Sequence, residues 1–312
     1  MADPSLAERA TASAFSLGWR AGRAMDSRPA RVVFDGGADL AWRRGGPAVD
    51  RLRANLRRVV GPEMTDSDLD ALTRQGIRSY ARYFREVFWL PTARPAVVTA
   101  RTRVYGEENL AGPRAAGRGV VCALPHSGNW DAAAVTYLDR FGPPVTVVAE
   151  RLRPESLYRR FTAYRESLGM VVLPLTGDRP SGPLLATTLR AGGTGCLMCE
   201  RDLSSSGVPV RFFGELITVP PGPALLAVQT GAALIPTVAG FDGDDWRLEF
   251  FPEVVVDGPE APKRLRDKII QAMQKVIDQF AVGVSAAPQD WHMVQRLWEQ
   301  DPAFAPTGSS AQ

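Results

Sequence analysis

The sequence predicts an α/β protein with a mostly parallel central sheet, helices on both faces of the sheet and an N-terminal helical segment. From residue 120 onward, short apolar runs alternate with helix-forming segments, which is the pattern of a parallel sheet. Before residue 100, apolar residues recur at helical spacing instead. We therefore expect a helical segment at 1–100 that can contact a membrane, an α/β core at 101–300 and a disordered tail at 301–312.

The composition is that of an ordinary globular protein. Of 312 residues, 23% are charged and 45% are hydrophobic, and the net charge of +3 does not indicate nucleic-acid binding. Only Lys263, Lys268 and Lys275 are lysines, so 37 basic residues minus 3 leaves 34 arginines. Arginine suits bidentate binding of phosphate, but a GC-rich genome also produces an arginine-rich chain. We attribute most of the excess to codon bias.

The cysteines and the hydropathy pattern bear on the compartment. Cys122, Cys196 and Cys199 lie in apolar runs, so we expect buried, reduced thiols. No second Cys or His pair completes a metal site, and we expect no metal. No stretch approaches the roughly twenty apolar residues that cross a bilayer, and charges interrupt the N-terminus where a signal peptide needs an apolar core. We expect the protein to stay on the cytoplasmic side.

Two helices are expected before the core. The first begins at Asp3-Pro4, and its apolar stripe lies beside Phe15, Trp19 and several arginines; this fits an interfacial membrane helix or a helix packed on the domain. The second follows the capping residue Thr65 and carries apolar residues at helical spacing up to Phe88. Another face of it carries Arg74, Arg78, Arg82 and Arg85. Such a row is more often a solvated face, but we favour attraction to anionic lipid headgroups or phosphates.

The core is expected to begin with a strand that ends at a histidine. The apolar run 120–124 fits a strand buried on both faces, Pro125 ends it, and His126 follows at its carboxyl end. Residues 127–129 are turn and N-cap residues before a helix at 130–138, and Asp131 lies in its first turn, close enough to reach back to the imidazole. An imidazole held by a carboxylate is a general base for an alcohol. The alternative is a turn histidine with an aspartate that favours the helix dipole.

The chain then alternates between strands and helices. Strands are expected at 145–149, 171–173 and 196–199, and helices at 155–168 and 184–190. Glu200 directly follows the last of these strands. Because the carboxyl ends of parallel strands meet at one edge of a sheet, we expect Glu200 and His126 in one cleft. Glu200 could bond His126, orient an acceptor hydroxyl or simply cap a turn, and either Asp131 or Glu200 can be the nearer partner of the imidazole.

The last third of the chain is expected to complete the sheet. Extended segments at 208–213 and 216–219 precede a helix at 224–230, and strands follow at 234–239 and at 246–251, the latter antiparallel at an edge. An amphipathic helix spans 265–280. Pro288 opens a last helix, and His292, the second of only two histidines, is expected to be structural.

Several of these blocks together resemble a known family. His126-x4-Asp131 is followed by Glu200-Arg201-Asp202, Phe212-Phe213-Gly214 and Pro220-Pro221-Gly222-Pro223. In this order they resemble the glycerolipid and lipid A acyltransferase superfamily. The chain is most similar to its lipid A lauroyl acyltransferase-like branch, which includes the phosphatidylinositol mannoside acyltransferases of actinobacteria. The likeness covers about residues 105 to 298.

The resemblance implies an acyl-CoA-dependent O-acyltransferase that needs no cofactor beyond acyl-CoA as co-substrate. It implies His126 as general base, with Asp131 and Glu200 as its catalytic partners. The acceptor would be a mannose hydroxyl of a phosphatidylinositol mannoside and the acyl group palmitoyl. The enzyme would work as a peripheral protein at the cytoplasmic face of the plasma membrane.

Further residues are expected to bind substrate. They lie on segments leaving neighbouring strand ends, on the polar loop after Glu200, or where many relatives have an arginine, and they are Glu150, Tyr164, Arg165, Arg201, Ser206 and Gln229. For each of them a salt bridge, a plain connector or core packing is the simpler alternative.

Other functions remain open at this point. Within the same class, the acceptor could be a lipid A precursor or a lysophospholipid. An esterase or thioesterase of the α/β-hydrolase type needs a serine in a Gly-x-Ser-x-Gly context, which the sequence lacks. A lipid-binding protein without chemistry would tolerate loss of His126.

Overall fold

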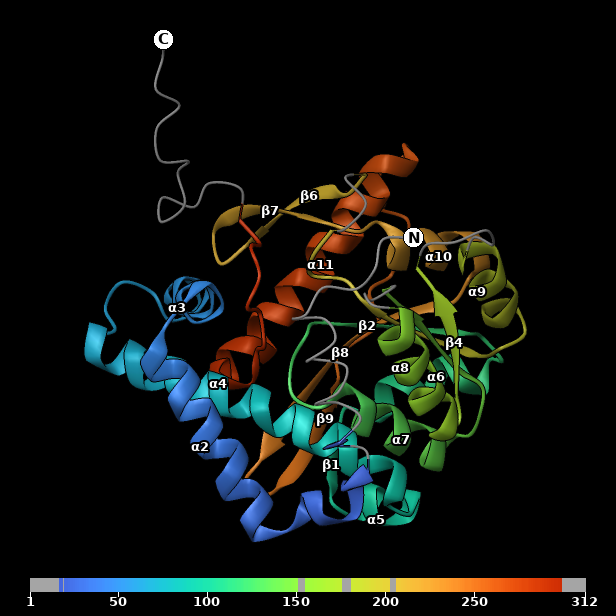
Figure 1. Ribbon diagram of the computed structural model, residues 1–312. Helices are drawn as coiled ribbons and strands as arrows, with labels where there is room; N and C mark the ends of the chain where they lie inside the picture. Colours follow the sequence, from blue (N-terminus) through green and yellow to red (C-terminus); the bar gives the residue numbers. More distant parts are fainter. Residues whose placement is uncertain (1–16, 19, 151–154, 176–180, 203–205, 299–312) are drawn as a thin grey trace.

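The computed structural model describes residues 17–18, 20–150, 155–175, 181–202 and 206–298. The expected helix beginning at Asp3 lies largely outside these residues, as does the expected tail at 301–312. Within the described part of the chain the fold class is confirmed: a seven-stranded, mostly parallel sheet is flanked by helices, and helices precede it in the sequence (Figure 1).

The central sheet has the strand order β1-β9-β8-β2-β5-β3-β4. Its members are β1 (Thr102–Tyr105), β2 (Val120–Leu124), β3 (Val145–Ala149), β4 (Met170–Pro174), β5 (Thr194–Met198), β8 (Ala233–Asp242) and β9 (Asp245–Phe250). All neighbouring strands are parallel except β8 and β9, which are antiparallel. The expectation that β9 is an edge strand is wrong, because β1 pairs with its other side and forms the edge.

Alternate residues of the central strand β2 enter two different cores. Val121 and Ala123 pack on the side of α9 (Ser181–Arg190), α10 (Gly222–Thr230) and α11 (Leu265–Ala286). Val120, Cys122 and Leu124 pack on the side of α6 (Glu108–Ala115) and α7 (Trp130–Phe141). A strand covered on both faces has no polar positions, which explains its uninterrupted apolar run.

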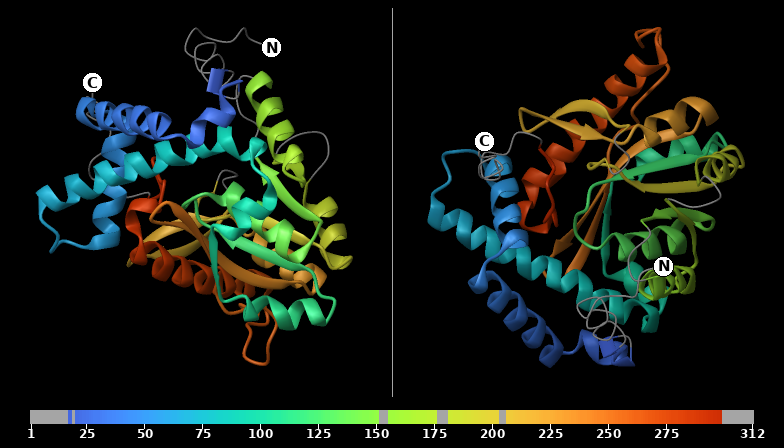
Figure 2. Two further views of the ribbon diagram at one scale, coloured as in Figure 1. Left: turned by 90° about the horizontal axis from the view of Figure 1, so that it is seen from below. Right: turned by 45° about the horizontal axis from the view of Figure 1, so that its top comes forward.

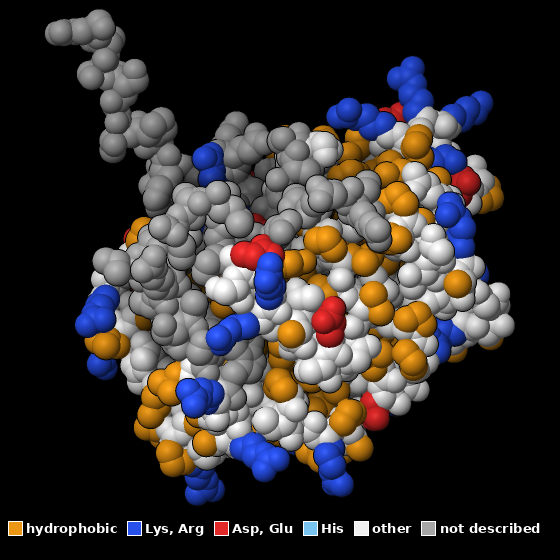
Figure 3. All heavy atoms as spheres, turned by 45° about the vertical axis from the view of Figure 1, so that its right-hand side comes forward, with side chains coloured by type: hydrophobic (Ala, Val, Ile, Leu, Met, Phe, Trp, Pro, Cys, Tyr) orange, Lys and Arg blue, Asp and Glu red, His pale blue; other side chains and the backbone are white. Residues whose placement is uncertain are grey.

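Two elements lie outside the central sheet. The strands β6 (Val208–Phe212) and β7 (Glu215–Val219) form an antiparallel hairpin against α11. Helix α8 (Glu155–Ser167) packs its buried side chains with those of α7 and the N-terminal helices. On the face that carries α8 and α9, hydrophobic side chains are interspersed with polar groups, and most Lys and Arg side chains lie toward the periphery of the view (Figure 3).

The N-terminal helices form an arm beside the sheet. The segment contains η1 (Gly22–Asp26), α2 (Arg28–Arg44), α3 (Pro47–Val60), α4 (Asp66–Trp89), η2 (Leu90–Thr92) and α5 (Pro95–Ala100). Helix α2 lies along α4 on the side away from the sheet (Figures 1 and 2). The cap predicted at Thr65 is confirmed, because its side chain accepts a hydrogen bond from the backbone N of Asp68 at 3.1 Å.

The arginine row on α4 binds the protein itself. Arg74 and Arg78 both hold Asp39 of α2, while Arg82 bonds Glu86 and the backbone oxygens of residues 243–245. Arg85 is buried and donates to the backbone oxygen of Met25. The row is therefore not an unpaired cationic surface: its arginines pair within the protein and fasten α2 and the β8–β9 turn to α4, although the Arg74 and Arg78 side chains remain 38% and 41% exposed.

The C-terminal segment also differs from the prediction. Pro288 begins a single 3-10 turn, η3 (Pro288–Asp290), where a helix was expected, and Trp291 then forms an antiparallel bridge with Ser127. Since the backbone after Asp290 pairs with the turn that follows β2, it is not free to continue a helix.

Candidate active site

His126 and Glu200 lie side by side because their strands do. The last residues of β2 and β5, Leu124 and Met198, are register partners, and the backbone N of Cys199 still bonds the Leu124 oxygen at 3.0 Å. His126 and Glu200 each stand two residues beyond those partners. The prediction that both emerge at the carboxyl edge of the sheet is confirmed.

Glu200 holds His126 at two atoms. Its Oε1 accepts hydrogen bonds from the backbone N of His126 at 2.5 Å and from its Nδ1 at 2.8 Å. The carboxylate is fully buried, whereas the imidazole side chain is 34% exposed. An ionised carboxylate can only accept, so Nδ1 carries the proton and the lone pair of Nε2 is free to take another. The ring is thus arranged as a base.

Opposing effects act on the Glu200 carboxyl group. Burial raises its pKa, but the charge of His126 and the hydrogen bonds from the His126 ring and backbone outweigh burial and bring the pKa below its usual value. Glu200 therefore stays ionised at neutral pH in spite of its burial. A fixed negative charge beside Nδ1 favours the imidazolium that forms when Nε2 takes a proton.

Asp131 does not reach the imidazole. It lies in the first turn of α7, as predicted, but its Oδ1 accepts from Arg165 Nε at 2.8 Å and its Oδ2 accepts from the Tyr83 hydroxyl at 3.0 Å. The expectation that Asp131 braces His126 is corrected, since both of its carboxylate oxygens are held by Arg165 and Tyr83. Asp131 instead neutralises Arg165, whose side chain is 17% exposed. Burial alone lowers the pKa of Arg165, and Asp131 more than offsets this and raises it.

The turn between β2 and α7 is held in a tight space. Gly128 has φ of 55°, and a Cβ atom on it would stand 2.5 Å from the backbone N of Gly240, so only glycine fits. Asn129 caps α7 by accepting from the backbone N of Ala132 at 2.9 Å, which confirms the predicted cap. The Asn129 amide also donates to buried Glu86 of α4 at 2.8 Å.

The backbone amides of this turn are largely occupied. Ser127 N donates to the oxygen of Pro125, and Gly128 N donates to the oxygen of Asp290. Neither of these two amides is available to hold an oxyanion, because their protons already have acceptors.

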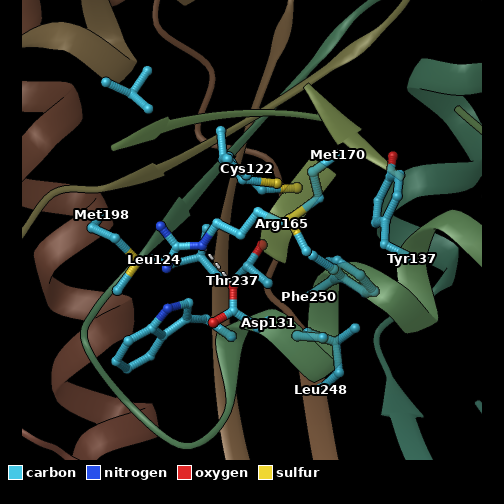
Figure 4. A pocket seen from close by; sticks show the side chains of 16 residues that line it. Cys122, Leu124, Asp131, Tyr137, Arg165, Met170, Met198, Thr237, Leu248 and Phe250 are labelled. Atoms are coloured by element: carbon cyan, nitrogen blue, oxygen red, sulfur yellow. Dashed lines mark hydrogen bonds and ion pairs between the residues drawn. The ribbon is translucent and has the colours of Figure 1, made fainter. Parts of the chain in front are cut away.

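A narrow apolar cavity lies beside the strand ends, between the sheet and α7. It has a volume of about 60 Å³ and is lined by the ends of β2 and β5, Leu124 and Met198, together with apolar residues further along the sheet. Arg165 extends across it and meets Asp131, and Met170 approaches from β4 (Figure 4). The Trp130 ring lines the cavity and stands edge-on to the His126 ring, with 5.7 Å between the centroids. Trp130 therefore lies against both the cavity and His126, whereas neither His126 nor Glu200 is among the residues that line the cavity.

Two thiols line this cavity. Cys122 and Cys196 are register partners on β2 and β5, and all three cysteines are free, as expected. The Cys122 thiol, together with burial, raises the pKa of Cys196 well above its ordinary value, and burial raises that of Cys199. Neither Cys196 nor Cys199 is therefore activated as a nucleophile.

The other predicted binding residues divide into three groups. Glu150 and Arg201 stand at the ends of β3 and β5 and approach each other to 3.7 Å, so both border the strand ends near His126. Tyr164 is a core side chain that packs edge-on against Phe161, and burial raises its pKa. Ser206 is exposed and follows residues outside the described part of the chain.

Gln229 does not join the site. It lies near the end of α10, where Arg190 donates to its backbone oxygen and Arg118, just before β2, donates to Gly231. This is the amino edge of the sheet, opposite His126. The correction follows from α10 running antiparallel to the strands, which carries its last turn away from the strand ends.

Sequence reasoning missed several supporting residues. Glu86 is buried on α4 and accepts from Asn129 and from the Trp246 indole, both at 2.8 Å, and Tyr83 holds Asp131. A carboxylate directly before the apolar run Val87-Phe88-Trp89 was the available signal, because an acid is rarely buried without partners. Among the residues that the structure describes, no group of three or more His, Cys, Asp or Glu side chains could hold a metal ion.

A histidine held by a buried carboxylate at the strand ends of an α/β sheet can take a proton from a hydroxyl, as acyl transfer to an alcohol requires. The comparisons with known proteins show the same class, and the protein is an acyltransferase. The family model of bacterial lipid A biosynthesis acyltransferases matches residues 5–300. The chain therefore belongs to the bacterial lipid A biosynthesis acyltransferase family.

Named relatives agree with the family. The chain is 46% identical over 288 residues to a phosphatidylinositol mannoside acyltransferase of Mycolicibacterium smegmatis, covering 92% of this chain and 91% of the relative. It is 44% identical over 300 residues to the protein of that name in Mycobacterium tuberculosis, covering 95% of this chain and 91% of the relative. The resemblance inferred from the motifs is thereby confirmed.

Proposed function

We propose that this acyltransferase moves a palmitoyl group from acyl-CoA to a mannose hydroxyl of a phosphatidylinositol mannoside. Two relatives that share 44–46% identity over more than nine-tenths of the chain carry this acceptor in their names. The observation that carries the chemistry is the contact between the buried Glu200 carboxylate and Nδ1 of the half-exposed His126, 2.8 Å long.

The transfer needs one proton acceptor that later becomes a donor. His126 Nε2 takes the proton of the acceptor hydroxyl while that oxygen attacks the thioester carbonyl carbon. The C–S bond then breaks, and the imidazolium returns the proton to the CoA sulfur. The products are the acyl ester and free CoA, and no acyl-enzyme forms. Glu200 keeps Nδ1 protonated throughout and balances the positive charge on the ring.

The cavity beside the dyad suits the acyl chain. Its wall is apolar apart from Asp131, Arg165 and a few single polar groups. At about 60 Å³ it admits only a few methylene groups as it stands. Met170 and Met198 stand in its wall, and methionine side chains are flexible enough to move aside for a longer chain.

Charged groups near the strand ends suit the polar parts of the substrates. Arg201 can bind a phosphate of CoA or of the acceptor, and its loose 3.7 Å contact with Glu150 can open for that purpose. Ser206 belongs to the same loop and can contact the same groups. Arg165 lines the cavity together with Asp131, and Tyr164 packs in the core beside them.

The acceptor is a membrane lipid, and α2 offers a surface for meeting the bilayer. Val32, Val33 and Leu40 lie on its outer face and are 70%, 69% and 47% exposed. Exposed arginines stand at both ends of the helix, Arg28 and Arg44 among them. An apolar helical face between cations suits a membrane surface with anionic lipids. No described helix is long and apolar enough to span a bilayer. We place the enzyme at the inner face of the plasma membrane, where acyl-CoA is available.

The proposal is tested by transfer from labelled palmitoyl-CoA to purified phosphatidylinositol mannosides, with the product identified by mass. The wild-type protein should form the acylated glycolipid, and His126→Ala should not, while keeping its fold by circular dichroism. A lipid A precursor and a lysophospholipid serve as competing acceptors. Preferred acylation of either one would replace the proposed acceptor, and release of free palmitate alone would indicate a thioesterase.

Contact with the membrane is tested separately. Val32→Asp and Val33→Asp should weaken sedimentation with vesicles that contain anionic phospholipid, and Val282→Asp, a comparably exposed valine on α11, should not. Equal binding of all three variants to the vesicles would show that α2 does not contact the membrane.

A further inference from the structure

The turn that carries His126 stands between two walls. On one side is the end of β8: the Ser127 hydroxyl donates to the Ala239 oxygen at 2.8 Å, and Gly128 abuts Gly240. On the other side is the C-terminal segment: Gly128 N donates to the Asp290 oxygen, and His292 N donates to the His126 oxygen, both at 2.8 Å. Neither wall is part of the H-x4-D box.

One carboxylate joins the two walls. Asp290 is 4% exposed, and its Oδ2 accepts from the backbone N of Phe241, at the end of β8, at 2.9 Å. Its Oδ1 accepts from the Ser79 hydroxyl of α4 at 2.9 Å. Ser79 also contacts the Nε2 atom of His292 at 3.0 Å. The carboxylate therefore fastens β8, α4 and the C-terminal segment around one turn.

The charges that face Asp290 come from two elements, α4 and β9. Arg82 of α4 and Arg247 of β9 favour its ionised form, while burial opposes ionisation and raises its pKa. On its own segment, His292 stays neutral, because burial lowers its pKa to about 3. The carboxylate does not touch the His126 ring.

We infer that Asp290 is a positioning residue for acyl transfer, which sets the His126–Glu200 contact by clamping the backbone of residues 126–128. Glu200 Oε1 receives both the backbone N and Nδ1 of His126, so a displacement of the backbone changes both bonds together. A misplacement of about 1 Å at a catalytic group costs on the order of 100-fold in rate. The inference rests on His126 acting as the base in the proposed function.

The test compares Asp290→Ala with Asn55→Ala. Asn55 is fully buried and donates to the oxygens of Met293 and Gln295, so it anchors the same C-terminal segment to α3 without touching the turn. Asp290→Asn is the conservative variant: its amide oxygen can still accept from Phe241, and its NH2 group can donate to Ser79 if that hydroxyl turns.

Asp290→Ala should lower kcat by about 100-fold, leave KM for acyl-CoA unchanged and move the acid limb of the pH–rate profile to lower pH. Asp290→Asn should lose about tenfold, since it reverses hydrogen bonds and removes a charge. Asn55→Ala should lose stability but keep kcat and the acid limb. If Asp290→Ala does not fold, the test compares kcat and the acid limb of the pH–rate profile between Asp290→Asn and Asn55→Ala instead. Equal losses of kcat in the Asp290 and Asn55 variants, or an unmoved acid limb, would overturn the inference.

A readout independent of acyl-CoA separates this inference from the proposed function. The chain has only two histidines, so the Nδ1 proton of His126 can be assigned by NMR. Its downfield resonance, expected for a proton shared with Glu200, should persist in Asn55→Ala and vanish in Asp290→Ala. If the resonance behaves in this way but no acyl transfer occurs, the function is wrong and the clamp stands; if it persists in Asp290→Ala, the clamp is wrong.

Discussion

Replacing Glu200 by glutamine removes a charge from the site while keeping nearly the same shape. The amide oxygen can still accept from the backbone N and Nδ1 of His126, which are 2.5 and 2.8 Å from Oε1. The NH2 group then takes the place of Oε2, which is buried and has no hydrogen-bond partner among the described residues. An unpaired buried donor costs about 1–3 kcal/mol of stability.

The loss of rate follows from the missing charge. Opposite charges roughly 4 Å apart attract by about 4 kcal/mol at an effective dielectric constant of about 20. The imidazolium forms only as the acceptor loses its proton, so this attraction lowers the barrier and not the energy of the resting state. About 4 kcal/mol corresponds to a rate about a thousandfold lower. Without the anion the ring also holds its proton less firmly, and the acid limb of the pH–rate profile should move to lower pH.

Single-turnover transfer from labelled acyl-CoA, measured across pH, gives both quantities. Glu253→Gln is the matched control, because Glu253 pairs with Arg118 at the opposite edge of the sheet, and it should behave like the wild type. A Glu200→Gln rate within tenfold of the wild type, with an unmoved acid limb, would refute the role of the carboxylate.

Three further predictions concern the surroundings of the dyad. Asp131→Asn leaves Arg165 without its anion and should lower the free energy of unfolding, measured in urea, by about 3–5 kcal/mol. The double variant Asp131→Asn/Arg165→Met should largely recover this loss. An unchanged unfolding midpoint in the single variant contradicts the prediction. Burial lowers the pKa of His292 in the folded protein to about 3, so the free energy of unfolding of the wild type falls by up to about 1.4 kcal/mol per pH unit below the pKa of the unfolded chain. In His292→Gln this fall should be smaller. Equal slopes of the free energy of unfolding against pH between pH 6.5 and 4.5 in both proteins would disprove it. Ala134→Phe narrows the cavity and should reduce palmitoyl transfer more than octanoyl transfer when both donors compete; an unchanged ratio would place the acyl chain elsewhere.

The strands of the sheet, and the reactive residues that follow their carboxyl ends, could be predicted from local sequence patterns. Buried parallel strands are short and uniformly apolar, so β2, β3 and β5 stand out, and the residue after each strand end is predicted to reach the same edge. His126 and Glu200 were found in this way without knowledge of any contact. The cap at Asn129 was likewise a local signal, since it depends on residues within one helical turn.

The partners of these groups were not accessible, because they depend on the order of strands and on distant segments. Asp131 is near His126 in sequence, yet Glu200 is the partner, since β5 lies next to β2 in the sheet. The arginines of α4 looked like a surface row until Asp39 of α2 was brought against them. Pro288 had the local signature of a helix start, and only pairing of Trp291 with Ser127 ends that helix after one turn.

The return of residues 290–292 to the turn beside β2 has a consequence for biosynthesis. During translation the H-x4-D box is made well before the segment that braces its turn. A nascent chain therefore carries His126 and Glu200 before the backbone around His126 is held in place.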